Sequence, residues 1–322
     1  MQKIGLVIDE GADLPREIIE KYQIEVVPLK MEWPDIEGLP GENTFQKMRE
    51  AEKRGIKSFG KTSQPSPKDF LDTFRRQFEK FEELICITIT SKHSGTFNSA
   101  CQAKNFLELE KQNKVFVLDS LNGSGGMGLL VLKAIDLIEV GEKKIEEIFK
   151  DLEAFRPKIM LRGILKDPKW LEASGRISST VANLIRKMEK IGLRPMLGIK
   201  NGVIKAVGIK TRAKDIPTAL FIEFKEKTKK LLSQNKKIRV AISHGDNLGI
   251  AQKLKEMIEE LRSSLILATM IEELRSSPIL AKASAIENEF KEVEVAFVSL
   301  IDNVLGVLIG PDALVLAWCE IT

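Results

Sequence analysis

The sequence predicts an α/β protein of two α/β domains, an N-terminal one with a mainly parallel sheet and a C-terminal one with a mixed sheet. Its 322 residues exceed the size at which one hydrophobic core keeps growing, so two domains are expected. Strands and helices alternate in the first half, which is typical of a parallel sheet covered on both faces. In the second half, Asn201-Gly202 lies between two apolar runs and indicates an antiparallel hairpin. We place the domains at residues 1–158 and 159–322.

The elements of the first half follow from its apolar runs and their boundaries. We expect strands at residues 3–9, 25–31, 83–88 and 114–119, helices at 15–22, 44–54 and 145–156, and a loop at 34–43. Ligands of parallel sheets bind at the carboxyl ends of the strands. The polar turns that follow Asp9, Thr88 and Asp119 are therefore expected to lie together.

The second half adds further strands, expected at 193–200, 203–209, 237–244 and 293–299, and a Lys-rich helix at 213–232 with a solvated face. The segment MIEELRSSLILA, which begins at Met257, recurs with one substitution from Met270. An offset of thirteen residues turns the two copies to different faces of a straight helix. Two copies do not make a solenoid, so we assign this repeat no function.

Composition excludes several classes of protein. The 50 basic and 46 acidic residues give a net charge of only +4, which argues against a nucleic-acid partner. Three scattered cysteines and two histidines do not suffice for a structural metal site. The N-terminus reaches an acidic residue too early for a signal peptide, and no apolar run has membrane-spanning length. We therefore expect a soluble, cytoplasmic protein without a membrane span.

Two polar segments are candidates for ligand binding. In the first, Ser66-Pro67 is explained as the cap and first position of a helix, whereas Thr62, Ser63 and Gln64 just before it are not needed for that purpose. In the second, Ser94 and Gly95 stand where a helix begins, and its N–H groups and dipole favour an anion. An ordinary N-cap serine explains Ser94 equally well. No glycine stands two residues before Ser94, so the segment is not a nucleophile elbow. A hydrolase triad is also disfavoured, because His93 is too near Ser94 in sequence to serve as its base and His244 belongs to the other predicted domain.

A glycine-rich turn follows Asp119-Ser120, and Gly123, Gly125 and Gly128 match G-x-G-x-x-G. A dinucleotide site also requires an acidic residue at the end of the next strand of the unit, and none is found. Close packing of a helix beside the ligand cleft explains these glycines better. A nucleotide or small anion bound at the Gly123–Gly128 turn stays open as the alternative function.

Arg176 stands alone after the probable glycine cap of a helix at Gly175. An arginine in such a place is usually a surface residue, but it can also contact an anion or a partner.

Taken in order, these segments resemble the DegV family of bacterial fatty-acid-binding proteins. The resemblance rests on the strand ending at Asp9, on Thr62 to Pro67, on Ser94-Gly95-Thr96, on the Asp119-Ser120 turn, and on Gly175-Arg176-Ile177 and Lys210-Thr211-Arg212. It implies a long-chain fatty acid such as palmitate, lying between the two domains, with its carboxylate on Thr62 and Ser94. Ser63, Gly95, Asp119 and Ser120 are expected to support these two residues.

The resemblance further implies a role in lipid metabolism or transport, in which the acid is presented to a separate fatty acid kinase that Arg176 contacts. We expect no catalytic residues and no cofactor other than the bound acid. One departure concerns a histidine that the family tends to carry two residues before Gly310-Pro311, where this chain has Leu308. Binding is then expected to be nearly independent of pH around neutrality, unless His244 lies in the site.

Overall fold

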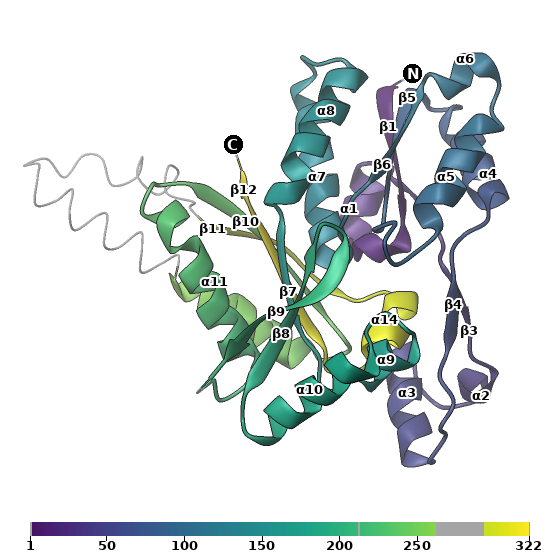
Figure 1. The fold of residues 1–322 in the computed structure, drawn as a ribbon. Coiled ribbons are helices and arrows are strands. Elements are labelled where there is room, and N and C mark those ends of the chain that lie inside the picture. The colour runs from purple at the N-terminus through teal and green to yellow at the C-terminus, as the bar shows by residue number, and fades with distance from the viewer. Residues whose placement is uncertain (1, 212, 262–292, 322) are drawn as a thin grey trace, which may run out of the picture.

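The computed structural model describes residues 2–211, 213–261 and 293–321, which form two sheets with helices packed around them (Figure 1). The second copy of the repeat and most of the first lie outside the described residues. No helix in the described ranges is both long and apolar enough to cross a bilayer.

The N-terminal sheet has four strands in the order β2-β1-β5-β6, and every pair is parallel. Its strands are β1 Gln2–Asp9, β2 Glu25–Val27, β5 Phe81–Thr88 and β6 Val115–Asp119. The first half also contains η1 Glu10–Ala12, α1 Arg16–Lys21, α4 Pro67–Gln77, α5 Thr96–Asn105, α6 Leu109–Gln112, α8 Ile145–Phe155 and η2 Arg156–Lys158. The predicted parallel sheet is confirmed.

The strand expected at 25–31 is two strands. After β2 the chain leaves the parallel sheet at Pro28, which has no N–H to donate to a ladder. It then forms β3 Lys30–Glu32, which pairs antiparallel with β4 Lys61–Ser63. Between these strands lie α2 Pro34–Glu37, inside the expected loop, and α3 Thr44–Lys53. The β3–β4 ribbon carries Thr62 away from the parallel sheet toward the second half of the chain.

The C-terminal sheet has six strands in the order β11-β10-β12-β7-β8-β9. Only β10 and β11 are parallel, so the predicted mixed sheet is confirmed. Its strands are β7 Met160–Ile164, β8 Arg194–Lys200, β9 Val203–Lys210, β10 Lys237–His244, β11 Val293–Leu300 and β12 Leu314–Ile321. Its helices include α9 Lys169–Ala173, α10 Ser179–Lys190, α11 Ile216–Leu232, a helix over 248–261, and α14 Asn303–Ile309. The predicted hairpin turns at Asn201 and Gly202, which both have positive φ, as a type I′ turn requires.

One helix joins the two sheets. Helix α7, Ser124–Val140, lies between them in Figure 1, and its first eight residues are all buried. Side chains of both sheets and of α7 form one continuous hydrophobic cluster. We propose the boundary between the two units at residues 158 and 159, because η2 ends there and β7 opens the second sheet.

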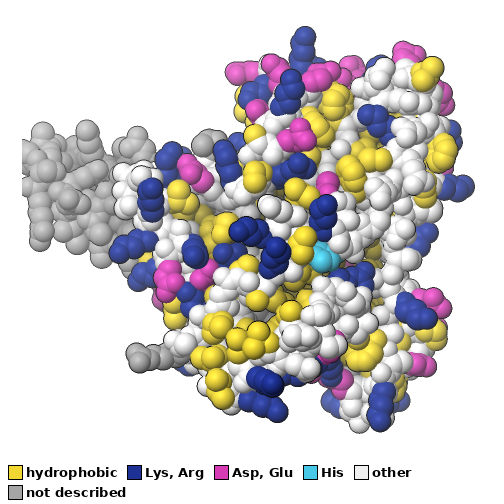
Figure 2. Space-filling model, in the orientation of Figure 1, with side chains coloured by type: hydrophobic (Ala, Val, Ile, Leu, Met, Phe, Trp, Pro, Cys, Tyr) yellow, Lys and Arg dark blue, Asp and Glu magenta, His cyan; other side chains and the backbone are white. Residues whose placement is uncertain are grey.

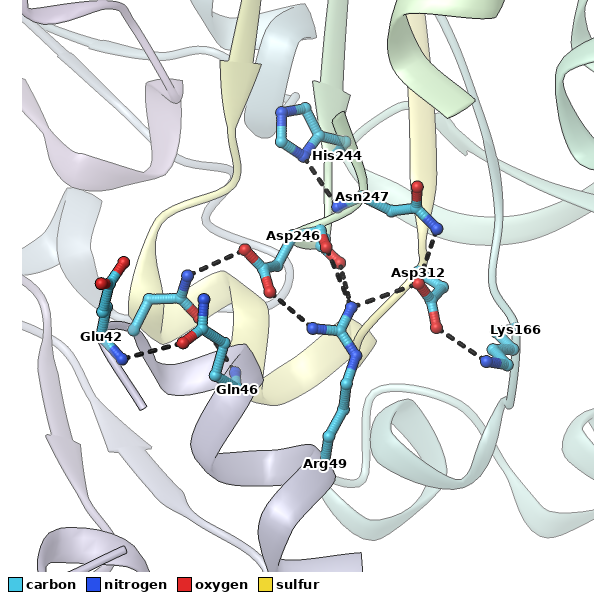
Figure 3. A network of polar contacts seen from close by, with 10 residues as sticks. Glu42, Gln46, Arg49, Lys166, His244, Asp246, Asn247 and Asp312 are labelled. Carbon is cyan, nitrogen blue, oxygen red and sulfur yellow. Dashed lines mark hydrogen bonds and ion pairs between the residues drawn. The ribbon is translucent and has the colours of Figure 1, made fainter. Parts of the chain in front are cut away.

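A polar network on another side of the molecule also joins the two units (Figure 3). The guanidinium of Arg49, from α3, lies 2.5 Å from Asp246 Oδ2 and 3.2 Å from Asp312 Oδ1. Lys166 pairs with the second oxygen of Asp312, and Asn247 donates to the first. Arg49 is the only cation of this network that comes from the N-terminal unit.

Replacing Arg49 with methionine should destabilise the protein by about 1–3 kcal/mol, because Asp246 and part of the Asp312 carboxylate lose a charged donor in a half-buried place. The matched control is Arg16→Met, whose ion pair with Glu20 is exposed to solvent and should contribute much less. Urea unfolding of the three proteins measures both effects. Equal losses in the two variants would show that the network adds nothing beyond a surface pair.

Candidate ligand-binding site

A cavity of about 260 Å³ lies between the two units and is lined mostly by apolar side chains. One wall is a face of the C-terminal sheet, to which β7 contributes Leu161 and Gly163, and Leu165 lines it just after the strand ends. Residues of α14, including Leu305 and Leu308, also line it. The remaining apolar lining residues are Leu29, Ile89, Leu171, Leu197, Ile199, Ile204, Val304, Ile309 and Val315.

Polar groups in the cavity wall come largely from the N-terminal unit. They are supplied by the β4 segment, by the turn between β5 and α5, and by the start of α7. The polar lining residues are Thr62, Ser63, Gln64, Thr90, His93, Ser94 and Ser124, together with Arg176 from the second unit and the backbone at Gly95 and Gly123. The predicted residues Thr62, Ser63, Ser94, Gly95 and Arg176 therefore meet at one cavity.

Arg176 contacts Thr62 directly, since its Nη2 donates to Thr62 Oγ1 at 3.2 Å. The other terminal nitrogen donates to the carbonyl of Ser174. Among the described residues no carboxylate forms an ion pair with this guanidinium, and burial lowers its pKa. A half-buried arginine without an anionic partner is suited to bind an anionic ligand. The hydroxyl proton of Thr62 remains free to be donated as well.

Two helices begin at the cavity without a side-chain cap. The cap residue of α5 is Gly95, one residue later than expected, and Ser94 Oγ instead accepts from the N–H of Thr96 at 3.3 Å. The cap residue of α7 is Gly123. Both glycines line the cavity, so the positive ends of two helix dipoles reach it. A Cβ at Gly95 would lie 2.9 Å from the side chain of Gln64, so this glycine lets the Thr62 segment approach.

The sequence shows which family has these features. The sequence model described as "Uncharacterised protein, DegV family" matches residues 3–275. A DegV domain-containing protein of Clostridium acetobutylicum is 37% identical over 207 residues, which are 63% of this chain and 70% of that protein. This chain belongs to the DegV family. A second relative, the fatty acid-binding protein of Thermotoga maritima, is 29% identical over 283 residues, covering 82% of this chain and 91% of that protein.

Solved structures of DegV proteins share the fold. A DegV protein of Thermus thermophilus, described for its fatty acid binding, superimposes with a TM-score of 0.72 at 24% identity, covering 99% of this chain and 100% of that one. One from Eubacterium eligens, loaded with heptadecanoic acid, gives 0.71 at 22% identity with the same coverage. The predicted family and the two-domain fold are both confirmed.

The side chains of Asp9, Asp119 and Ser120 in this DegV protein hold the backbone of nearby turns and do not line the cavity. Asp119 Oδ1 accepts from the N–H groups of Ser91 and Leu121, and Ser120 bonds the backbone of Asn122. Asp9 accepts from the N–H of Gly11 and of Ile89, and its burial raises its pKa to about 7. Asp119 and Ser120 thus shape the turns next to the cavity without lining it.

The glycines of the Gly123–Gly128 turn are accounted for by packing. A Cβ on Gly125 would lie 3.0 Å from Ala241, and one on Gly128 would lie 2.7 Å from Phe297. These contacts seat α7 on the C-terminal sheet, which was the preferred explanation of the motif. No cluster of metal-binding side chains occurs in the described part of the chain.

His93 also lines the cavity, although no sequence pattern pointed to it as a ligand-binding residue. Its Nε2 accepts from the N–H of Ile204 on β9 at 2.9 Å, and Thr90 Oγ1 donates to the carbonyl of Gly202 at 2.9 Å. The two bonds fasten the β8–β9 hairpin to the turn that carries Ser94. His244, the residue considered beforehand, lies in the Arg49 network (Figure 3) and does not line the cavity. No local pattern could reveal the His93 contact, because its partner is 111 residues away.

His93 should make stability depend on pH. Burial, and then the charge of Arg176, lower its pKa. The folded protein therefore favours the neutral ring of His93. The stability that the neutral ring contributes is fully present above the unfolded pKa of about 6.5 and is lost as the pH falls from that value toward the lower pKa of the folded state. We expect the stability difference between the wild type and His93→Asn to shrink from about pH 7.5 to about pH 5.5.

Urea unfolding of the ligand-free proteins across this range measures that difference. Asparagine keeps an acceptor for the Ile204 N–H but does not titrate. Asp9 has the opposite effect, because its raised pKa makes the protein less stable as the pH rises toward 7. This effect is the same in the wild type and in His93→Asn, so it cancels in the stability difference between them. A difference that is constant with pH would contradict the assignment.

Proposed function

We propose that this DegV protein binds a long-chain fatty acid such as palmitate in the cavity between its two units. Its carboxylate would accept from Thr62 and Ser94, with Ser63 and Gly95 beside them, and its chain would follow the apolar wall. The observation that carries this proposal is the convergence of two uncapped helix N-termini and an unpaired arginine on an otherwise apolar cavity. An amphiphile with one anionic end matches that combination.

The energetics support an acyl ligand. A sixteen-carbon acid would bury about fifteen carbons at roughly 0.8 kcal/mol each, on the order of 12 kcal/mol before costs. Association and ordering offset a large part of this. The tail thus supplies affinity, and the headgroup needs only donors to position it. The relatives that are described as binding fatty acids support the same ligand class.

We further propose that the protein is a carrier without catalytic residues of its own, acting in lipid metabolism or transport by presenting the acid to a separate fatty acid kinase. Near the headgroup end, Arg176 is half-buried and therefore partly open to a partner. Hydrophobic side chains gather over α10 and the adjoining hairpin on the face seen in Figure 2, with Lys and Arg among them. Leu184 on α10 and Ile209 on β9 are exposed there.

The headgroup assignment predicts that Thr62→Ala combined with Ser94→Ala lowers palmitate affinity about tenfold or more, since two hydrogen bonds to a charged carboxylate are lost. The control is Ser91→Ala in the same turn, whose side chain does not line the cavity. Titration with a fluorescent fatty acid measures affinity, and circular dichroism checks the fold. A folded double variant with wild-type affinity would refute this headgroup site.

The position of Arg176 changes what we expect of its removal. The sequence alone suggested that Arg176→Ala would spare ligand binding and impair transfer to the kinase. Since the guanidinium lines the cavity and holds Thr62, we now expect lower palmitate affinity as well as slower phosphorylation by ATP and a bacterial fatty acid kinase. Arg75→Ala, exposed on α4 and away from the cavity wall, serves as the control. Unchanged affinity together with unchanged phosphorylation would leave Arg176 a structural role only.

A further inference from the structure

Gly163 interrupts the apolar face of the C-terminal sheet. It lies one residue before the end of β7 and is buried. Alternate residues of a strand share a face, and Leu161, two residues before it, lines the cavity, as does Leu165 just after the strand ends. Across the sheet its register partners are Val315 on β12 and Leu197 on β8, which also line the cavity. The face therefore has a depression one side chain deep, bounded by four larger residues.

The protein's own structure does not require a glycine here. The backbone of Gly163 is not in the left-handed region, which would favour glycine. A Cβ built on it would lie 3.5 Å from Val315 Cγ2 and 3.8 Å from the carbonyl of Leu314, which are ordinary contacts. Glycine inside a strand costs stability because it loses more entropy and packs less surface than other residues. The missing side chain therefore needs another reason.

Gly198 shows what a structurally required glycine looks like in the same wall. It lines the cavity from β8, the neighbouring strand. A Cβ there would lie 2.7 Å from the carbonyl oxygen of Leu161 and 3.0 Å from Val207. Sheet packing thus explains Gly198 and leaves Gly163 unexplained.

We propose that Gly163 is a specificity-determining residue, whose missing side chain provides the space through which an unbranched acyl chain crosses β7. The inference rests on the proposed binding of fatty acids and adds where the chain runs. Strands are about 4.8 Å apart, so a depression one residue wide between Val315 and Leu197 admits a single polymethylene chain against the backbone. Glycine within a strand commonly marks such a close approach. A side chain here would obstruct long acids before short ones.

The test compares Gly163→Ala and Gly163→Leu with the wild type. Each delipidated protein is titrated with palmitate and with decanoate, and its thermal midpoint is measured without ligand. We expect the ratio of palmitate to decanoate affinity to fall about threefold in Gly163→Ala and at least tenfold in Gly163→Leu. The midpoint of ligand-free Gly163→Ala should equal or exceed that of the wild type, since the added methyl group meets only ordinary contacts.

Two controls separate this role from general packing. Gly198→Ala should lower the midpoint, because its Cβ meets backbone, and Ala206→Val, exposed on β9 of the same sheet, should leave the affinity ratio unchanged. A wild-type affinity ratio in Gly163→Ala and Gly163→Leu would overturn the inference while leaving fatty acid binding intact. A lower midpoint in ligand-free Gly163→Ala would also overturn it, since the glycine would then have a structural cause. Failure of the proposed function itself would be visible in the wild type, as absence of binding to either acid.

Discussion

The burial of α7 between two sheets is the constraint on which the rest of the structure depends. The buried first half of such a helix must be apolar and must be narrow where it meets a sheet, which is why Gly125 faces Ala241 and Gly128 faces Phe297. Because these contacts seat the first turn of α7, they also set where Gly123 and Ser124 lie. The start of the helix is then held at the cavity, with its N–H groups directed there. The motif that resembles a dinucleotide fingerprint therefore positions the uncapped start of α7 at the cavity through packing.

The same arrangement couples ligand binding to the contact between the two units. Donors on one side of the cavity come mainly from the N-terminal turns, and the apolar wall comes from β7, β8, β12 and α14. Neither unit has a complete site. Contacts at the border of the cavity or outside it therefore also determine its shape. They are the Arg49 network, the Arg176–Thr62 hydrogen bond, and the two hydrogen bonds that hold the β8–β9 hairpin against the N-terminal unit. A ligand that spans the units adds to the same association and should stabilise it.

Much of the fold could be predicted because its signals are local. Alternating strands and helices, the Asn201-Gly202 turn and the helix starts are all encoded within a few neighbouring residues. The central strands β7 and β12 were missed, since fully buried strands lack the alternation that identifies a half-buried one. Among the residues that line the cavity, Thr62 could be found because its polarity exceeds what helix capping requires, and Ser94 because it stands at a predicted helix start. The contributions of His93 and Gly163 could not be predicted from the sequence. His93 acts through a partner on β9, far away along the chain, and Gly163 acts through a missing side chain that has meaning only once the cavity wall has formed.

Two buried acids, Asp13 and Asp302, lie near the proposed headgroup end of the cavity, where two full negative charges would repel an anionic ligand. Ser124, which lines the cavity, donates to Asp13, and the N–H of Asp302 donates to the other oxygen of the same carboxylate. Burial raises the pKa of Asp13 to about 6, and burial followed by the charge of Asp13 raises the pKa of Asp302 well above its usual range. The pair therefore holds a proton near neutral pH and carries less negative charge than two free carboxylates would. Since Ser124 gives its proton to Asp13, its hydroxyl is not left as a donor for a ligand in the cavity. The acids thus orient the start of α7 and of α14 without making that end of the cavity repel an anion.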